Sequence, residues 1–284
     1  MPIAYDASRS ALYTPECGDT VFERGQPYSP LQLAVEAARL AYYRAEASTD
    51  ERARLTEALD RVDFAEPTLF VHAATGGAAF GTCRRSDGTM LLAFRGTQPD
   101  NLRNLLSDAR ANLVAWSESA GRAHSGFATA ARALLPQILQ WIESARAEPE
   151  RSIMTGHSLG AALATLVATT RKPTWLVTLG SPRVGDAALA STVTAAHTVR
   201  LVDCCDAVTE MPPPVGGYVH VGLRTYLTAD GQVVENATDE TVTRDRLRAQ
   251  VRYAFRYATR FWRNVLIRPL ADHAPINYAR AFFP

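Results

Sequence analysis

The spacing of hydrophobic residues predicts two helices near the N-terminus. Ser29 followed by Pro30 is typical of a helix start, because serine caps free amides and proline suits the first turn. Apolar residues then recur from Leu33 to Ala41 with the spacing of one buried helix face, and a second helix is expected from Asp50 to Val62. We therefore expect a helical segment over about residues 29–62.

After Pro67 the pattern changes to short apolar runs that are typical of strands. These runs cover Thr68–Ala74, Ala78–Cys83 and Met90–Phe94. Glycine-containing turns lie between them, at Gly76-Gly77 and Ser86-Asp87-Gly88. The pattern predicts antiparallel strands joined by hairpins.

From about Gly126 onward, helical and strand patterns alternate. The expected order is a helix to Ser144, a strand near Ile153, a helix over Leu159–Thr170, a strand over Thr174–Leu179, a short helix and a strand over Thr198–Val202. Alternation of this kind indicates crossover connections and a mostly parallel sheet. Ligands bind at the carboxyl ends of such strands, so the chemistry should lie in the loops that follow them.

Composition narrows the classes of protein that fit. The chain has 284 residues, of which 47% are hydrophobic, and its formal net charge is +1. A disordered chain would combine low hydrophobicity with large net charge, so we expect a folded protein. No internal repeat or long low-complexity segment divides the chain, and one α/β domain over residues 1–284 is the simplest account. The near-neutral balance gives no overall attraction to nucleic acid, and no nucleic-acid partner is predicted.

The cysteines and the first residues bear on location. The four cysteines are too few and too scattered for a disulfide framework. The first ten residues, MPIAYDASRS, lack the positive and apolar regions of a secretory signal. We therefore predict a cytoplasmic location, with secretion by another route left open.

The clearest chemical motif is Gly156-His157-Ser158-Leu159-Gly160, which matches G-x-S-x-G between an expected strand and helix. In this motif a sharp turn exposes the serine hydroxyl, and the glycines let neighbouring elements pack closely. The alternative is a serine that only caps a helix. The context favours Ser158 as a nucleophile.

A serine nucleophile needs a histidine base and an acid that orients it, and both follow the serine in α/β-hydrolases. Of the downstream histidines, His197 enters a strand and His220 lies in an alternating, strand-like run from Gly217 to Gly222. His273 lies on an expected loop between helices, so it is the preferred base, with His220 as the alternative.

For the acid, the strand that ends near Val202 runs into a loop that contains Asp203 and Asp206. Asp206 lies beyond the strand end and is preferred, and Asp203 is the alternative. Asp186 is expected to cap a helix instead.

The oxyanion of an acyl-transfer reaction needs hydrogen-bond donors that are already aimed at it. The amide of Leu159 follows from the motif itself, at the start of the helix. The run Phe94-Arg95-Gly96-Thr97 supplies a second candidate, the amide of Thr97, unless this run is only a glycine turn.

Several segments together resemble the class 3 lipases, the family of the fungal triacylglycerol lipases. The matching segments, in order, are Ala93–Thr97, His124–Phe127, Gly156–Gly160, Leu179–Asp186, Val199–Val208, and Asp272-His273 with Tyr278. The resemblance implies an α/β-hydrolase fold with helices on both faces of the sheet. It also implies metal-free ester hydrolysis by a triad of Ser158, Asp206 and His273, with His220 as a non-catalytic histidine.

Two further segments bear on lipid contact. Leucines at helical spacing within residues 101–108 resemble the lid of such lipases, although an ordinary surface helix would have the same pattern. Residues 243–268 are predicted to form one basic helix with eight arginines and one acid, either a solvated cover of the core or a peripheral contact with a lipid surface.

We therefore predict a serine carboxylester hydrolase without cofactor or metal, a lipase that acts on a lipid or other ester substrate. A phospholipase A1 or short-chain esterase would use the same residues. From another class, a non-catalytic lipid-binding protein could retain the fold.

Overall fold

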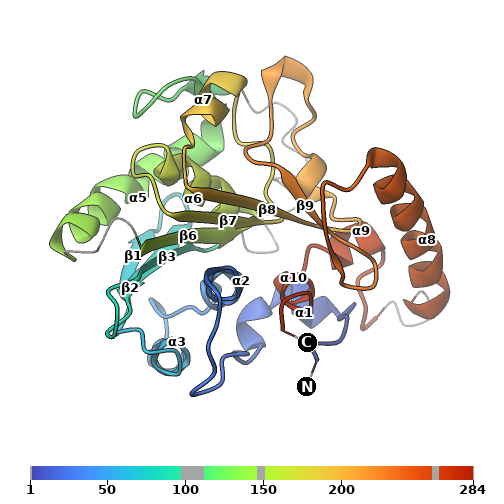
Figure 1. The fold of residues 1–284 in the computed structure, drawn as a ribbon, viewed down its shortest axis with the longest axis horizontal. Coiled ribbons are helices and arrows are strands. Elements are labelled where there is room, and N and C mark those ends of the chain that lie inside the picture. The colour runs from blue at the N-terminus through green and yellow to red at the C-terminus, as the bar shows by residue number, and fades with distance from the viewer. Residues whose placement is uncertain (1, 97–111, 146–150, 258–261, 284) are drawn as a thin grey trace.

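The central sheet of the molecule has eight strands, in the order β1-β2-β3-β6-β7-β8-β9-β10 (Figure 1). The computed structural model describes residues 2–96, 112–145, 151–257 and 262–283. The strands are β1 (Thr68–His72), β2 (Gly77–Cys83), β3 (Met90–Phe94), β6 (Ser152–His157), β7 (Trp175–Leu179), β8 (His197–Asp203), β9 (Arg224–Leu227) and β10 (Val233–Glu235). A separate antiparallel pair consists of β4 (Leu113–Ala115) and β5 (Arg122–His124).

The middle of the sheet is parallel and its edges are antiparallel. Strands β3, β6, β7, β8 and β9 pair in parallel, in that order. Hairpins join β1 to β2 and β2 to β3, and β10 runs antiparallel to β9. The mostly parallel sheet with an antiparallel N-terminal part is thus as predicted from the alternation of patterns.

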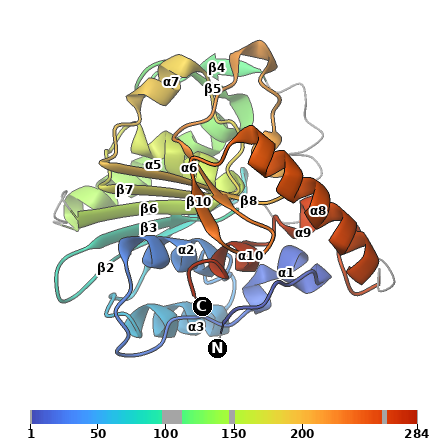
Figure 2. The same ribbon diagram turned by 45° about the vertical axis from the view of Figure 1, so that its right-hand side comes forward.

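Helices cover both faces of the sheet, as predicted. The α-helices of the described residues are α1 (Arg9–Tyr13), α2 (Pro30–Leu40), α3 (Thr49–Asp60), α5 (Ser125–Ser144), α6 (Leu159–Ala168), α7 (Ala187–Thr192), α8 (Asp239–Tyr257), α9 (Arg268–Ala271) and α10 (Pro275–Ala279). Helices α2 and α10 lie on one face, and α5 and α6 lie on the other (Figure 1). Helix α8 lies outside the edge that β9 and β10 form (Figure 2).

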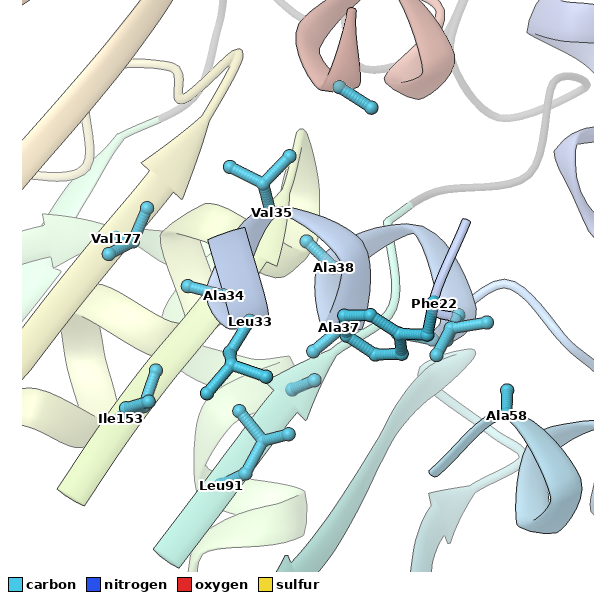
Figure 3. Close-up of a cluster of buried hydrophobic side chains, with 14 of the residues drawn as sticks. Phe22, Leu33, Ala34, Val35, Ala37, Ala38, Ala58, Leu91, Ile153 and Val177 are labelled. Atoms are coloured by element: carbon cyan, nitrogen blue, oxygen red, sulfur yellow. The ribbon is translucent and has the colours of Figure 1, made fainter. Parts of the chain in front are cut away.

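Successive side chains of each central strand point to opposite faces of the sheet and so contribute to two hydrophobic cores. In β3, Leu91 and Ala93 face the cluster under α2, whereas Leu92 and Phe94 face α5 and α6. Figure 3 shows how α2 meets the first cluster, with Leu33 pointing toward Leu91 and Ile153 on the strands. A strand that is buried on both sides needs a continuous apolar run, which explains the uninterrupted sequence Met90–Phe94.

The start of α2 is fixed by the residues that predicted it. The Ser29 hydroxyl accepts a hydrogen bond from the Gln32 amide at 3.3 Å, and the Gln32 side chain accepts one from the Ser29 amide at 3.0 Å. Pro30 occupies the first turn, where its missing N–H costs nothing. This reciprocal capping places the end of α2 and Tyr42 beneath the carboxyl end of β6.

Two sequence-based expectations about local structure are wrong. The run around His220 is a loop rather than a strand, because Gly216, Gly217 and Gly222 adopt φ of 78°, 90° and 78°, which breaks the extended backbone. Only Val219 in this run forms an isolated bridge, with Gly185.

The basic segment 243–268 is also not one helix. Helix α8 spans Asp239–Tyr257, and residues 262–267 are not helical. The chain folds back there because Val265 is buried in a cluster with Tyr253, and its amide donates a hydrogen bond to the Ala7 carbonyl at 2.9 Å. Within the described residues, no helix is both long and apolar enough to span a bilayer.

Candidate active site

Ser158 occupies a strained turn between β6 and α6. Its backbone has φ 58° and ψ −125°, a region that residues other than glycine rarely adopt. A Cβ on Gly160 would overlap the Phe94 carbonyl, and one on Gly156 would overlap the backbone of Gly160. The two glycines of the motif are therefore what allows the turn to form against β3.

The Ser158 hydroxyl and the His273 imidazole are buried and each has an unused polar atom. Neither Oγ of Ser158 nor Nε2 of His273 has a hydrogen-bond partner among the described residues. The two are therefore not joined to each other in this structure. Hydrogen bonds of a catalytic site often tighten only when substrate binds, so an open hydroxyl and an open base are compatible with nucleophilic chemistry.

His273 lies on the short connection between α9 and α10, as predicted. Its Nδ1 is 2.8 Å from Oδ2 of Asp206, and both side chains are almost completely buried. A carboxylate accepts hydrogen bonds, so this contact places the imidazole proton on Nδ1 and leaves the lone pair on Nε2. That tautomer can accept a proton from an alcohol.

Asp206 is held in place by two further donors. The Tyr278 hydroxyl donates to the same Oδ2 at 2.6 Å, and the Val208 amide donates to Oδ1 at 2.8 Å. Burial and, secondarily, the charge of Asp206 raise the pKa of Tyr278 well above its ordinary value, so its hydroxyl keeps its proton. The carboxylate is thus fixed by three hydrogen bonds.

Leu179, Gly180 and His157 connect the serine turn to the imidazole. The Ser158 amide donates to the Leu179 carbonyl at 2.9 Å, and a Cβ on the next residue, Gly180, would lie 3.1 Å from the His273 ring and 2.8 Å from Oδ2 of Asp206. The ring of His157, next to Ser158, lies against that of His273 with centroids 4.5 Å apart. The serine turn and the proposed base are therefore close neighbours.

His157 is itself anchored to α2. Its Nδ1 lies 2.7 Å from the Tyr42 hydroxyl. Burial, followed by the nearby His273, lowers the pKa of His157 well below its ordinary value. His157 is therefore a neutral, positioned neighbour of the base. His157 occupies a variable position of the G-x-S-x-G motif, so the sequence did not indicate its contact with His273. No sequence signal indicated a role for Tyr42.

Of the two predicted oxyanion donors, only Leu159 lies within the described residues. Leu159 is the first residue of α6, so its amide is one of the free N–H groups of the helix start. Thr97 lies outside the described residues. Gly96, immediately before it, lies so close to the Tyr42 hydroxyl and the His157 carbonyl that a side chain there would overlap the hydroxyl.

The rival residues do not join this arrangement. Asp203 lies 3.4 Å from Arg280, and burial raises its pKa well above its ordinary value. Burial, with nearby arginines, lowers the pKa of His220 to about 3, and its Nδ1 has no partner among the described residues. His197 stacks on Trp175, and Asp186 caps α7 through the Leu189 amide.

One group among the described residues has metal-ligand atoms close together. These atoms, on Cys204, Cys205 and Asp272, lie within 4.8 Å of one another. However, Asp272 already accepts hydrogen bonds from the Arg268 guanidinium at 3.0 Å and the Cys205 amide at 2.9 Å. A buried arginine beside the carboxylate disfavours a bound cation, and we assign this group no metal role.

The chain is similar to known proteins in both sequence and structure. The model of the family "Lipase (class 3)" matches residues 91–216. This match includes Thr97, Ser158 and Asp206 and ends before His273, so the position of His273 is supported by the geometry above rather than by the family match.

Two characterised fungal proteins are among the similar sequences. Secreted mono- and diacylglycerol lipase A of Penicillium cyclopium is 30% identical over 186 residues, which are 62% of this chain and 59% of the relative. A lipase of Rhizopus niveus is 30% identical over 181 residues, 58% of this chain and 46% of that protein. The chain therefore matches about half the length of these relatives.

The solved structures agree with the fold. Lipase II from Rhizopus niveus superposes with a TM-score of 0.58 at 25% identity, covering 70% of this chain and 79% of that one. The α/β-hydrolase fold implied by the sequence resemblance is thereby confirmed.

The prediction of a cytoplasmic location is wrong. It was based on the absence of a recognisable signal in the first residues. The similar proteins from two Penicillium species and from Fusarium solani are named as secreted lipases, which contradicts it.

Proposed function

We propose that the chain, which matches the class 3 lipase family over residues 91–216, is a serine carboxylester hydrolase that cleaves acylglycerol esters. The observation that carries the proposal is the pairing of Nδ1 of His273 with Asp206, 2.8 Å apart, near the strained turn of Ser158, whose hydroxyl has no hydrogen-bond partner among the described residues. We further propose that residues 1–284 act as one domain.

In the first half of the reaction, Ser158 is the nucleophile. Its Oγ attacks the ester carbonyl carbon while Nε2 of His273 takes the hydroxyl proton. Asp206 stabilises the imidazolium that forms. The amide of Leu159, together with that of Thr97, donates hydrogen bonds to the oxyanion. His273 then gives the proton to the leaving alcohol, and the acyl group remains on Ser158.

In the second half, water replaces the alcohol. His273 takes a proton from water, whose oxygen attacks the acyl-serine carbonyl. When the tetrahedral intermediate collapses, the proton passes to Oγ and the fatty acid leaves. Each proton taken up by His273 is returned within the same half-reaction, so no cofactor or metal is needed.

The relatives support the class of substrate and the location. Similar proteins are named as mono- and diacylglycerol lipases and as secreted. We propose that this chain also acts on acylglycerols, outside the cell. A peripheral contact with a lipid surface belongs to the same proposal, because long-chain acylglycerols present their esters at an interface.

Covalent labelling by a fluorophosphonate tests the central claim. The wild-type protein should be labelled at Ser158, and the Ser158→Ala variant should lose both the label and all ester hydrolysis. Ser181, a buried serine whose hydroxyl is hydrogen-bonded to the Pro182 carbonyl, provides the control, and Ser181→Ala should still be labelled. A folded wild type that takes no label would favour a non-catalytic lipid-binding protein.

A panel of p-nitrophenyl esters, acylglycerols and phospholipids tests the substrate. Preference for acylglycerols supports the proposal, whereas preference for phospholipids or short esters would favour a phospholipase A1 or an esterase. The predicted lid, residues 101–108, lies outside the described residues and remains part of the proposal. A rate that does not rise above the solubility limit of one ester would argue against a lid.

A further inference from the structure

Helix α8 presents apolar side chains to solvent on the face opposite its contacts with the protein. Val242, Ala249 and Tyr253 are buried on its inner side. Leu247, Val251 and Phe255 follow one another at intervals of four, so they form one stripe, and they are 62%, 57% and 85% exposed. Among the described residues, six of the nine large hydrophobic side chains that are exposed lie between Leu247 and Ile267.

A row of arginines runs beside this stripe. Arg244, Arg248, Arg252 and Arg256 are also spaced by four, and all are exposed. Arg248, Arg252 and Arg256 each directly follow a stripe residue, and Arg244 lies one turn before Arg248, so the row runs along one flank of the stripe. Arg244 and Arg252 pair with exposed carboxylates of Glu240 and Asp230, contacts that are weak in water and can be exchanged for other anions.

The exposed apolar side chains continue past the helix. Trp262 and Leu266, in the non-helical segment after α8, are 64% and 72% exposed, and the exposed Arg263 lies between them in sequence. A helix with aromatic and aliphatic residues on one side and arginines alongside is the pattern of proteins that lie in the interfacial plane of a membrane.

The inner side of α8 is attached to the loops that carry the proposed acid and base. Arg246 donates to the Cys204 carbonyl at 2.7 Å, two residues before Asp206. Arg268 donates both to the Ala249 carbonyl at 3.3 Å and to Asp272, next to His273, at 3.0 Å. A contact on the outer side of α8 would therefore orient the part of the molecule that holds these loops.

The charges favour an anionic lipid surface over a second copy of the chain. A symmetric dimer through this face would bring the same arginine row from both subunits into one interface, where like charges repel. The overall charge of +1 gives no general attraction to anions, so only a local patch of this kind could supply one. Arginine and apolar residues side by side match a surface with anionic headgroups above acyl chains.

We propose that the outer face of α8, comprising Leu247, Val251, Phe255 and the four arginines, docks the protein on a lipid surface that contains anionic headgroups. This rests on the peripheral lipid contact of the proposed function and specifies the face that makes it and the charge of the headgroups, and the docking itself needs no catalysis. It can therefore be tested in a Ser158→Ala background, where a failure of the hydrolase proposal has no influence on the result.

Flotation of the full chain with vesicles tests the docking. The vesicles are of phosphatidylcholine alone or of phosphatidylcholine mixed with phosphatidylglycerol. The Ser158→Ala protein should float with the mixed vesicles and much less with the neutral ones. Phe255→Ser should weaken partitioning of the protein into the vesicles by roughly tenfold, because one aromatic side chain is then no longer buried in the lipid surface. Arg248→Glu should remove the preference for the anionic vesicles.

Matched controls distinguish an effect of the α8 face from the effect of changing any exposed residue. Leu223→Ser removes an equally exposed leucine outside α8, and Arg52→Glu makes the same charge change on α3. Both should float as the parent does. Val251→Ser is a second stripe variant, and circular dichroism melting should show that each variant keeps the parent fold.

Several results would contradict docking of α8 on an anionic lipid surface. Absence of flotation with either vesicle, equal flotation with both, or equal loss in the control variants would overturn the proposal. Sedimentation of the lipid-free protein as a dimer that Phe255→Ser dissociates would assign the face to a second copy of the chain instead.

Discussion

Nδ1 of His273 lies 2.8 Å from Oδ2 of Asp206, although 67 positions separate the two residues in sequence. The same carboxylate oxygen accepts a hydrogen bond from Tyr278, so the proposed base and the proposed acid are both held by the segment from α9 to α10. Single substitutions of Asp206, His273 and Tyr278 can therefore test the role of each side chain in turn.

Asp206→Asn should lower kcat by about 10⁴-fold, because an amide in this position disfavours the imidazole tautomer that can accept a proton. Steady-state kinetics on a soluble ester measure the effect. The matched control is Asp203→Asn. Burial already raises the pKa of Asp203 well above its ordinary value, so a neutral amide is a close substitute and activity should persist. The reverse pattern would make Asp203 the acid.

His273→Ala should lower kcat on the order of 10⁶-fold, because the alcohol of Ser158 then has no base. His220→Ala should leave kcat close to that of the wild type, since the donors to the Asp206 carboxylate are Val208, His273 and Tyr278 and not His220. Both variants are compared by kcat and by thermal unfolding. An inactive but stable His220→Ala protein would contradict the assignment.

Tyr278→Phe removes a hydrogen bond of 2.6 Å to Asp206 while it keeps the ring that packs in the core. Because hydrogen bonds to charged groups contribute about 1.5–3 kcal/mol, we expect a decrease in kcat of roughly tenfold or more with little change in KM. Tyr28→Phe removes a hydroxyl that accepts a hydrogen bond from the Glu23 amide and makes none with Asp206, so it is the control and should not alter kcat. An unchanged kcat in Tyr278→Phe would limit Tyr278 to packing.

His220 should make the stability of the fold sensitive to acid. Burial lowers its pKa to about 3, whereas an imidazole in the unfolded chain titrates near 6.5. Between these values the unfolded state binds more protons, so the free energy of unfolding falls as the pH drops, by at most about 1.4 kcal/mol per pH unit. His157 contributes in the same direction.

The His220→Gln variant isolates the contribution of His220. Its curve of unfolding free energy against pH should be flatter than that of the wild type below pH 6.5, and the two should run parallel above it. Urea unfolding at several pH values measures both curves. Parallel curves throughout would mean that His220 is not shielded from protonation in the folded state.

Much of the fold could be predicted because its signals are local. The capping pair of Ser29 and Gln32, the apolar run of β3 and the glycines around Ser158 each determine structure within a few residues. The sequence also brought Ser158, Asp206 and His273 together as candidates, since each follows a strand end or lies between helices.

The errors arise where long-range contacts decide the structure. The alternating pattern around His220 resembles a strand, but glycines with positive φ turn it into a loop. Residues 262–267 have a helical pattern, yet pairing with the segment near Ala7 draws Val265 out of the helix. The contact between Tyr42 and His157 joins residues 115 positions apart, and no local pattern could indicate it.

The attachment of His273 to the last helices has a consequence for synthesis of the protein. The serine turn is complete when α6 has left the ribosome, but the base emerges only with the segment between α9 and α10. In a nascent or truncated chain that lacks this segment, the Ser158 hydroxyl would have no base to activate it. By the proposed mechanism, hydrolytic activity would therefore arise only after α9 and α10 have been synthesised and have docked beneath the sheet.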